Sequence, residues 1–274
     1  KYSKSDRGTY DLSNINANFF DVDADYRQWD SYLSLLGNAS LDNYRDNKLS
    51  RYSEYKNYIH TADVMLRVIK KDYNFNVGVQ VVPQKSHFVQ DYQSVHTDTT
   101  RTVTNVTPTA DFRWKISKLS QLRFTYRGNT SQPSMTDLLD ITDDSNPLNV
   151  KKGNPGLKPS FTQNFRLFYN NYIQNHQRSI MAHLMFSTTD NSISNMVTYD
   201  KTTGGRTTRP ENINGNWNAF GMFMFNTAID TAAYFNVNTF TTVNYSNSVG
   251  YVSVDKADSQ KSTTRTTNLS ERIA

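Results

Sequence analysis

The chain has 274 residues, no cysteine, and 30 lysines and arginines against 25 aspartates and glutamates. The lack of cysteine excludes disulfides, iron–sulfur clusters, thiolate zinc sites and a cysteine nucleophile, but it leaves the cellular compartment undecided. Basic residues are spread along the chain in no run longer than a pair, so no nucleic-acid groove is expected, and no window holds the roughly 20 apolar residues of a helical membrane span.

Apolar and polar residues alternate along most of the sequence, which is the pattern of β-strands with two different faces. Every second residue from Tyr73 to Val81 is apolar, and the same rhythm recurs around Phe112, Phe124 and Phe165 and from Phe235 to Tyr251. In chain order, the alternation predicts about ten strands near 4–18, 52–70, 72–92, 101–116, 121–131, 158–173, 178–199, 207–227, 234–254 and 259–273. Several exceed the roughly 9–11 residues that a tilted strand needs to cross a bilayer, so their length favours the wall of an antiparallel, up-and-down transmembrane β-barrel.

The connections between these strands alternate in length. Those at 70–72, 117–121, 173–178 and 228–234 are short, whereas those around 20–51, 90–100, 131–157, 199–210 and 253–259 are mostly longer. Outer-membrane barrels have short turns at one rim and long loops at the other, and a soluble sandwich has no reason to sort its loops in this way.

A single β-barrel domain over residues 1–274 is expected, because no Gly/Ser-rich or Pro-rich linker divides the chain. One or two helical turns are expected within 25–51, where Trp29, Leu33 and Leu36 form a stripe that ends at Gly37. The first residues already have the composition of a strand, so no signal peptide is expected and the chain has the character of an excised piece.

A set of basic side chains falls opposite the apolar face of the predicted strands. On the lipid side each arginine would cost about 2–4 kcal/mol at the bilayer midplane, whereas a water-filled interior accepts it at little cost. The residues predicted to face such a lumen are Arg113, Lys115, Arg123, Arg127, Arg166 and His183. Aromatic residues near strand ends, such as Tyr169 and Tyr245, suit either the aromatic girdles at the membrane interface or ordinary cross-strand packing.

The segment 129–172 contains three proline motifs in succession: Ser131-Gln132-Pro133, Asn146-Pro147-Leu148 and the run GNPGLKP at 153–159. It resembles the barrel domain of TonB-dependent outer-membrane receptors. The closer likeness is to the Bacteroidetes outer membrane protein β-barrel family, and it extends to the stretches 204–207, 209–210, 212–217 and 268–272. The similarity is strongest from about 105 to 274.

This resemblance implies a barrel of about 22 strands with an N-terminal plug, in the outer membrane of a Gram-negative bacterium, that imports solutes with energy relayed by TonB. The chain would supply about half of such a wall. No plug-like segment and no TonB-contacting box are found in it, so TonB would act only through segments absent from this chain. The implied partners are outer-membrane lipid and an unidentified solute that long external loops capture.

The GNPGLKP run is interpreted as a structural turn rather than a ligand contact. Its prolines cannot donate hydrogen bonds to a sheet, and glycine next to asparagine tolerates unusual backbone angles, so the chain must leave the sheet here and re-enter it. The residues concerned are Gly153, Asn154, Pro155, Leu157, Lys158 and Pro159.

No metal, cofactor or catalytic site is predicted. The triplet Asp21, Asp23 and Asp25 has the opening spacing of a calcium loop but lacks the turn glycine and the final glutamate, so a solvated acidic loop is favoured over an irregular ion site. The same reading applies to Asp140, Asp143 and Asp144. The five histidines, His60, His87, His96, His176 and His183, show no paired helical spacing, and no nucleophile, phosphate-loop or dinucleotide motif occurs, so no enzymatic activity is expected.

Two alternatives to solute uptake stay open at this point. One is an outer-membrane barrel that transports nothing and acts as a surface adhesin or assembly scaffold. The other is a soluble β-sandwich or carbohydrate-binding module, in which solvent takes the place of the lumen.

Overall fold

The computed structural model describes residues 2–11, 41–92, 95–139, 142–144, 146–174, 177–230, 234–254 and 260–274, and these are almost entirely β-strand. The chain divides into two compact units, the first formed by Lys1–His60 with Pro83–Val103 and the second by Thr61–Val82 with Thr104–Ala274. Strands β4 (Tyr73–Tyr92) and β5 (Val95–Lys115) run through both units. No helix of the described residues is long and apolar enough to cross a membrane.

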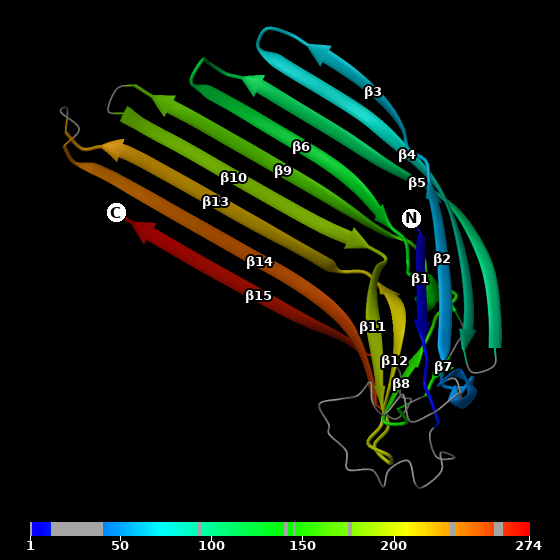
Figure 1. The fold of residues 1–274 in the computed structure, drawn as a ribbon. Coiled ribbons are helices and arrows are strands. Elements are labelled where there is room, and N and C mark those ends of the chain that lie inside the picture. The colour runs from blue at the N-terminus through cyan, green and yellow to red at the C-terminus, as the bar shows by residue number, and fades with distance from the viewer. Residues whose placement is uncertain are drawn as a thin grey trace, which may run out of the picture. The chain divides into compact units, whose positions relative to one another are not determined.

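The second unit is built on long neighbouring strands (Figure 1). In spatial order they are β3 (Ala62–Ile69), the first half of β4, the second half of β5, β6 (Ser120–Ser131), β9 (Ser160–Ile173), β10 (Arg178–Asp190), β13 (Asn216–Ala228), β14 (Asn236–Val254) and β15 (Gln260–Ile273). All pairs from β5 to β15 are antiparallel. The connections from β3 to β4, β5 to β6, β9 to β10 and β13 to β14 are short, and the strand ends that they join lie along one edge of the unit.

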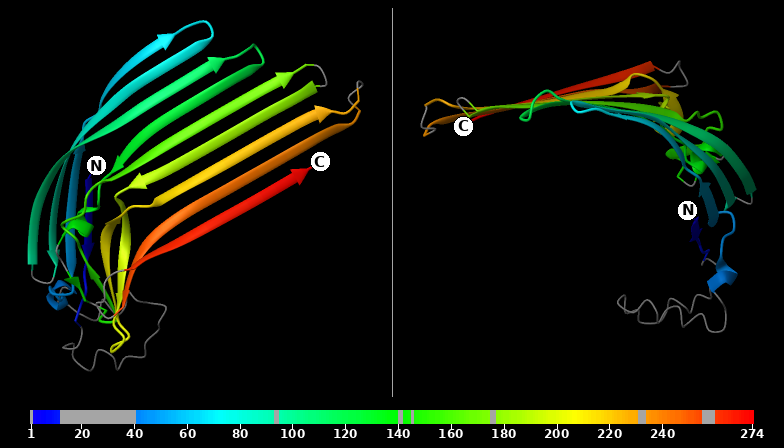
Figure 2. Two further views of the ribbon diagram at one scale, coloured as in Figure 1. Left: turned by 180° about the vertical axis from the view of Figure 1, so that it is seen from behind. Right: turned by 90° about the horizontal axis from the view of Figure 1, so that it is seen from above.

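At the opposite end of this unit, β10 and β13 bend into a second hairpin. Asn191, with φ 51°, separates β10 from β11 (Ser192–Tyr199), and Gly215, with φ 118°, separates β12 (Arg206–Ile213) from β13. Both are left-handed conformations that glycine and asparagine adopt most readily. Beyond the bend, β11 pairs with β12 and also runs parallel to the last residues of β14, as Figure 2 shows from behind.

The described residues of the proline-rich segment 132–159 pair with β12 of this second hairpin and hydrogen-bond to it. The segment contains the short helix α2 (Met135–Leu138), the two-residue strand β7 (Thr142–Asp143) and β8 (Asn149–Lys152), which pairs in parallel with β12. Ser134 caps α2 by accepting a 3.1 Å hydrogen bond at Oγ from the Asp137 N–H. The large apolar side chains of this region that are buried are Met135, Leu139, Leu157 and Ile213.

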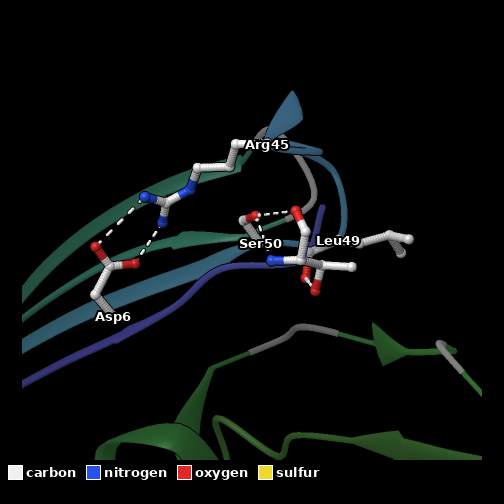
Figure 3. A network of polar contacts seen from close by, with 5 residues as sticks. Asp6, Arg45, Leu49 and Ser50 are labelled. Carbon is white, nitrogen blue, oxygen red and sulfur yellow. Dashed lines mark hydrogen bonds and ion pairs between the residues drawn. The ribbon is translucent and has the colours of Figure 1, made fainter. Parts of the chain in front are cut away.

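The first unit pairs β1 (Tyr2–Arg7) with β2 (Arg51–Ile59), and β2 with the second half of β4. Before β2 lies the 3₁₀ turn η2 (Leu41–Tyr44), followed by an Arg45–Asp6 ion pair back to β1 (Figure 3). Ser50 Oγ accepts a 3.0 Å bond from the Thr9 N–H and donates to the Thr9 carbonyl at 3.2 Å. These bonds hold the entry to β2 against the end of β1.

The predicted all-β class and the short turns are confirmed, but the described residues form fifteen strands rather than about ten. Three predicted strands are each divided: 52–70 into β2 and β3, 178–199 into β10 and β11, and 207–227 into β12 and β13. Strands β7 and β8 lie inside a predicted loop. The loop expected at 90–100 is wrong, because β4 continues to Tyr92 and β5 starts at Val95, where threonines suit a strand on either face.

Two parallel pairings, β11 with β14 and β12 with β8, depart from the purely antiparallel pattern. Of the first predicted strand, 4–18, only Tyr2–Arg7 is β1 with an isolated bridge at Tyr10, and residues 12–18 lie outside the described part. The helical stripe of Trp29, Leu33 and Leu36 also lies outside it.

Candidate functional site

Every basic residue predicted to face a lumen from β5, β6, β9 and β10 lies on one face of the second unit, because directly opposed residues in an antiparallel pair share a face. Arg113 opposes Arg123, which opposes Phe168, which opposes His183. The neighbouring rows hold the others: Lys115 opposes Gln121, Arg127 opposes Asn164, and Arg166 opposes Thr125. We call this side of the second unit the polar face.

On β5, β6, β9 and β10 the polar face carries five cations and the single carboxylate of Asp111, and Arg272 of β15 lies on the same face. Asp111 accepts hydrogen bonds from Arg123 Nε at 3.0 Å and Nη2 at 2.8 Å, and a third from Thr125 Oγ1 at 3.1 Å. Within the described residues, Arg127 and Arg166 have no hydrogen bond or ion pair, and both are exposed. The face therefore keeps an excess of positive charge that is directed at solvent.

A hollow of about 400 Å³ opens on this face. It is lined by Arg123, Thr125, Arg127, Asn164, Arg166, Phe168 and His183. The His183 ring is flanked by two phenyl rings in edge-to-face geometry, with ring centroids 6.1 Å from Phe168 and 6.4 Å from Phe220. The arrangement offers guanidinium donors beside aromatic surface, and these groups bind anions and ring systems rather than react with them.

The opposite face of the same strands is apolar and exposed. Leu184 is 51% exposed, and Val243 and Leu269 are 41% and 71% exposed. An aromatic row crosses five strands on this face, one side chain from each: Tyr126, Phe165, Phe186, Trp217 and Tyr245, with neighbouring ring centroids 4.8–6.1 Å apart. We call this side the apolar face.

The GNPGLKP turn lies between β8 and β9 and is held on β12 by Asn154, a residue that is 6% exposed. Asn154 Nδ2 donates to the Pro210 carbonyl at 2.9 Å, and Oδ1 accepts from the Gly156 N–H at 3.0 Å and from Arg209 Nη2 at 3.1 Å. The Asn154 N–H donates to the Asp137 carbonyl at 2.5 Å. One buried residue thus joins the turn, α2 and β12.

Asn212 repeats this pattern at the other end of the turn. Its Oδ1 accepts from the Lys158 N–H at 2.7 Å, and its Nδ2 donates to the carbonyls of Lys158 at 3.0 Å and Asn191 at 2.9 Å. Gly153 passes so close to Leu139 that a Cβ there would overlap the Leu139 carbonyl. We call residues 153–159 together with β12 the docked turn. Pro155 is exposed, Leu157 is buried, and Pro159 leads directly into β9.

The remaining candidates do not form a centre in the described residues. No group of three histidine or carboxylate side chains there could hold a metal ion. His87 pairs with Asp98 at 2.8 Å and His96 with Asp91 at 2.5 Å, both in the first unit, and no partner of the His60 side chain is found among the described residues. The candidates Asp21, Asp23, Asp25, Asp140 and His176 lie outside the described part, while Asp143 is in β7 with Asp144 just after it.

Sequence reasoning missed the apolar residues on the polar face. Met185, Phe220 and Met222 belong to it, since Arg166 opposes Met185, Met185 opposes Phe220 and His183 opposes Met222. The signal was present, because Met181 and Met185 interrupt an otherwise polar face in the alternation of 178–190. A simple two-class alternation assigns such residues to the lipid side.

Comparison with solved structures finds bacterial receptors at low identity. The siderophore receptor PirA from Pseudomonas aeruginosa is 10% identical with a TM-score of 0.45, and the alignment covers 82% of this chain and 51% of that one. A double mutant of the hemophore receptor HasR of Serratia marcescens, in complex with its hemophore HasA and heme, is 10% identical with a TM-score of 0.42, and the alignment covers 76% of this chain and 44% of that one. The chain therefore spans about half the length of these receptors.

No curated protein sequence matches the chain. Residues 12–273, however, match the outer membrane protein beta-barrel family. That match takes in the proline motifs and nearly all of the strands described above. The chain belongs to this family, and it is a β-barrel protein of the outer membrane.

Proposed function

We propose that the protein takes up a solute across the outer membrane in the manner of a TonB-dependent receptor. The polar face lines the passage, the apolar face contacts lipid, and loops at the end opposite the short turns capture the ligand. Energy would be relayed by TonB through parts of the protein other than these strands. The proposed role is non-enzymatic and uses no cofactor.

One observation carries this proposal: the same strands present opposite chemistry on their two faces. Leu184, Val243 and Leu269 are well exposed on the apolar face, and Arg123, Arg127 and Arg166 occupy the polar face. If water surrounded both faces, the large apolar side chains of the apolar face would be exposed to water, which is unfavourable. If lipid surrounded both faces, each arginine of the polar face would cost about 2–4 kcal/mol at the bilayer midplane. Lipid on one side and water on the other satisfies both sets.

The docked turn would serve this function structurally. By fixing residues 153–159 on β12, it determines where the chain re-enters the sheet at β9, whose Arg166 and Phe168 line the hollow. It offers no free polar group for a ligand at Asn154, since that side chain is buried and hydrogen-bonded at both ends.

The absence of cysteine allows a direct test of the two faces. Ser187→Cys on the polar face and Leu184→Cys on the apolar face of β10 each introduce a single thiol into the chain. In outer-membrane vesicles, a bulky, membrane-impermeant maleimide should modify the first and not the second. Modification at position 187 should also slow solute entry into the vesicles.

Trp217→Cys in the aromatic row is a further control, expected to resist the same reagent. Labelling of Leu184→Cys as fast as Ser187→Cys would contradict the lipid contact of the apolar face. Solute entry that is unchanged after complete labelling of Ser187→Cys would contradict a passage along the polar face.

A further inference from the structure

The polar face is not uniformly polar: it carries an apolar stripe on β10 and β13. Four of the seven methionines of the chain lie in this stripe, together with Phe220. Met181 opposes Met224, His183 opposes Met222, and Met185 opposes Phe220. A passage lined only for small hydrophilic solutes has no use for such a stripe, since apolar surface left against water is unfavourable.

The stripe lies directly beside the arginines. One row runs from Thr125 through Arg166 and Met185 to Phe220, and the next runs from Arg123 through Phe168 and His183 to Met222. Adjacent strands are about 4.8 Å apart, so a guanidinium on β9 and a phenyl ring on β13 are about 10 Å apart in the sheet. That span matches a small ring system with one charged substituent.

His183 joins the two rows into one surface. Its ring lies between Phe168 and Phe220, with interplanar angles of 75° and 80°, and has no hydrogen-bond partner in the described residues. The surface around it is therefore aromatic and thioether-rich. Methionine side chains adapt to ligands of different shape, because they are unbranched and polarizable.

The positive charge of the polar face determines whether an anionic or a cationic ligand is favoured. Asp111 is engaged by Arg123 and Thr125, and the other two arginines that line the hollow, Arg127 and Arg166, have no partner in the described residues. A cationic solute would meet Arg113, Arg127 and Arg166 at close range and be repelled. An anion would gain charge-assisted hydrogen bonds from the two unpartnered guanidinium groups.

We propose that this surface binds an organic anion with an apolar body. The carboxylate, sulfonate or phosphate of the ligand contacts Arg127 and Arg166, and its ring or chain lies over Phe168, Met185 and Phe220. This inference rests on the proposed function, because it requires the polar face to be open to water. The hollow of about 400 Å³ falls within the range of small-molecule sites.

Three water-soluble probes distinguish the contribution of the ligand's charge to binding from that of its apolar body. They are naphthalenesulfonate, the neutral and nearly isosteric naphthalenesulfonamide, and methanesulfonate, which has no ring. Binding is measured by titration calorimetry on the full protein in nanodiscs of uncharged lipid, with empty nanodiscs subtracted. The sulfonate should bind at least about tenfold more tightly than either of the other two, as the loss of one charge-assisted contact implies.

Two variants assign the contributions to residues. Arg127→Gln combined with Arg166→Gln should weaken the sulfonate about tenfold and leave the sulfonamide unchanged. Met185→Gln should weaken both ring probes. Arg265→Gln combined with Arg272→Gln removes two charges from β15, that of Arg265 from the apolar face and that of Arg272 from the polar face. Because β15 lies about 19 Å from β9 across four strand spacings, this variant should change the binding of neither ring probe.

The proposal is overturned if sulfonate and sulfonamide bind equally, or if the β15 variant weakens the sulfonate as much as the β6 and β9 variant does. Failure here is distinguishable from failure of the proposed function. If labelling at position 187 blocks solute entry but naphthalenesulfonate does not bind, the passage along the polar face is supported and the anionic ligand is rejected. If naphthalenesulfonate binds but no solute enters the vesicles, the anion-binding surface is supported and the proposed uptake function is rejected.

Discussion

Two regions of the second unit are stabilised in different ways. The long strands β6, β9, β10, β13 and β14 are joined by regular antiparallel pairing, and they leave large apolar side chains such as Leu184 exposed. The docked turn buries Leu157 and Ile213 and is held by the amides of Asn154 and Asn212. The first region depends on its surroundings, and the second resembles the interior of a soluble protein.

This contrast indicates where a substitution should act locally and where it should act through the membrane. In the long strands the backbone is satisfied by its neighbours, so the energetic consequence of a side chain depends on the medium it faces. In the docked turn the backbone leaves the sheet, so each buried polar group needs its own partner. Substitutions placed in each region should therefore respond differently to the presence of a bilayer.

The largest effect is expected from Gly153→Ala in the docked turn. A Cβ at this position would overlap the Leu139 carbonyl, and the backbone there is fixed by the Asn154 N–H bond to Asp137. We expect destabilisation of about 3 kcal/mol or more, seen as a loss of the folded species in urea titrations of the refolded protein. Gly250→Ala in β14, where nothing lies within 4 Å of the new Cβ, is the matched control. Equal stability of the two variants would show that residues 153–159 are not held against α2.

The next effect is expected from a charge on the apolar face. Leu184→Arg should destabilise the protein in bilayers by about 2–4 kcal/mol if the residue lies near midplane, whereas Ser187→Arg on the polar face of the same strand should have little effect. Unfolding by denaturant in lipid vesicles measures both. If both arginines are equally tolerated, the apolar face of the long strands is not in contact with lipid.

A smaller, local effect is expected from Asn154→Ala. The substitution removes the partner of the Pro210 carbonyl, the Gly156 N–H and Arg209 Nη2 at a buried position, so we expect a loss of about 2 kcal/mol. Asn195→Ala in β11 is the control, because that side chain is exposed and unbonded within the described residues. The difference between the two midpoints of denaturation gives the contribution of the Asn154 side chain. If the unfolding free energy of Asn154→Ala lies within about 0.5 kcal/mol of that of the control, water readily replaces the hydrogen bonds of the Asn154 side chain.

The sequence was sufficient to predict the long strands, because their two faces differ at every second residue. It did not reveal the bends at Asn191 and Gly215, since a single asparagine or glycine within an alternating run is also compatible with an unbroken strand. The contacts of the docked turn join residues 54–56 positions apart, such as Asn154 with Pro210 and Lys158 with Asn212. Alternation within a segment contains no information about such pairs.

The candidate site was predictable in part, because the alternation along each strand shows which residues share a face. Charge opposite an apolar face identified Arg123, Arg127 and Arg166, and the pairing register brings them into neighbouring rows. The register could not be read from a single strand, so the proximity of Met185 and Phe220 to Arg166 emerged only from the pairing of β9, β10 and β13.

The smallest effect is expected in the turn between β11 and β12, beside the docked turn. The pKa of Asp200 is lowered because its ionised carboxylate accepts hydrogen bonds, first from the Thr202 side chain and then from the N–H groups of Thr202 at 2.8 Å and Thr203 at 3.2 Å. A lowered pKa means that these bonds stabilise the turn fully above the ordinary pKa of an aspartate and cease to do so as the pH falls through the lowered value. Hydrogen exchange at Thr202 and Thr203, corrected for the intrinsic rate, should therefore be constant from about pH 7 to pH 5 and lose protection only in stronger acid. Asp200→Asn, which keeps one acceptor oxygen but cannot ionise, should remove this pH dependence, and a variant that still loses protection in acid would place the titrating group elsewhere.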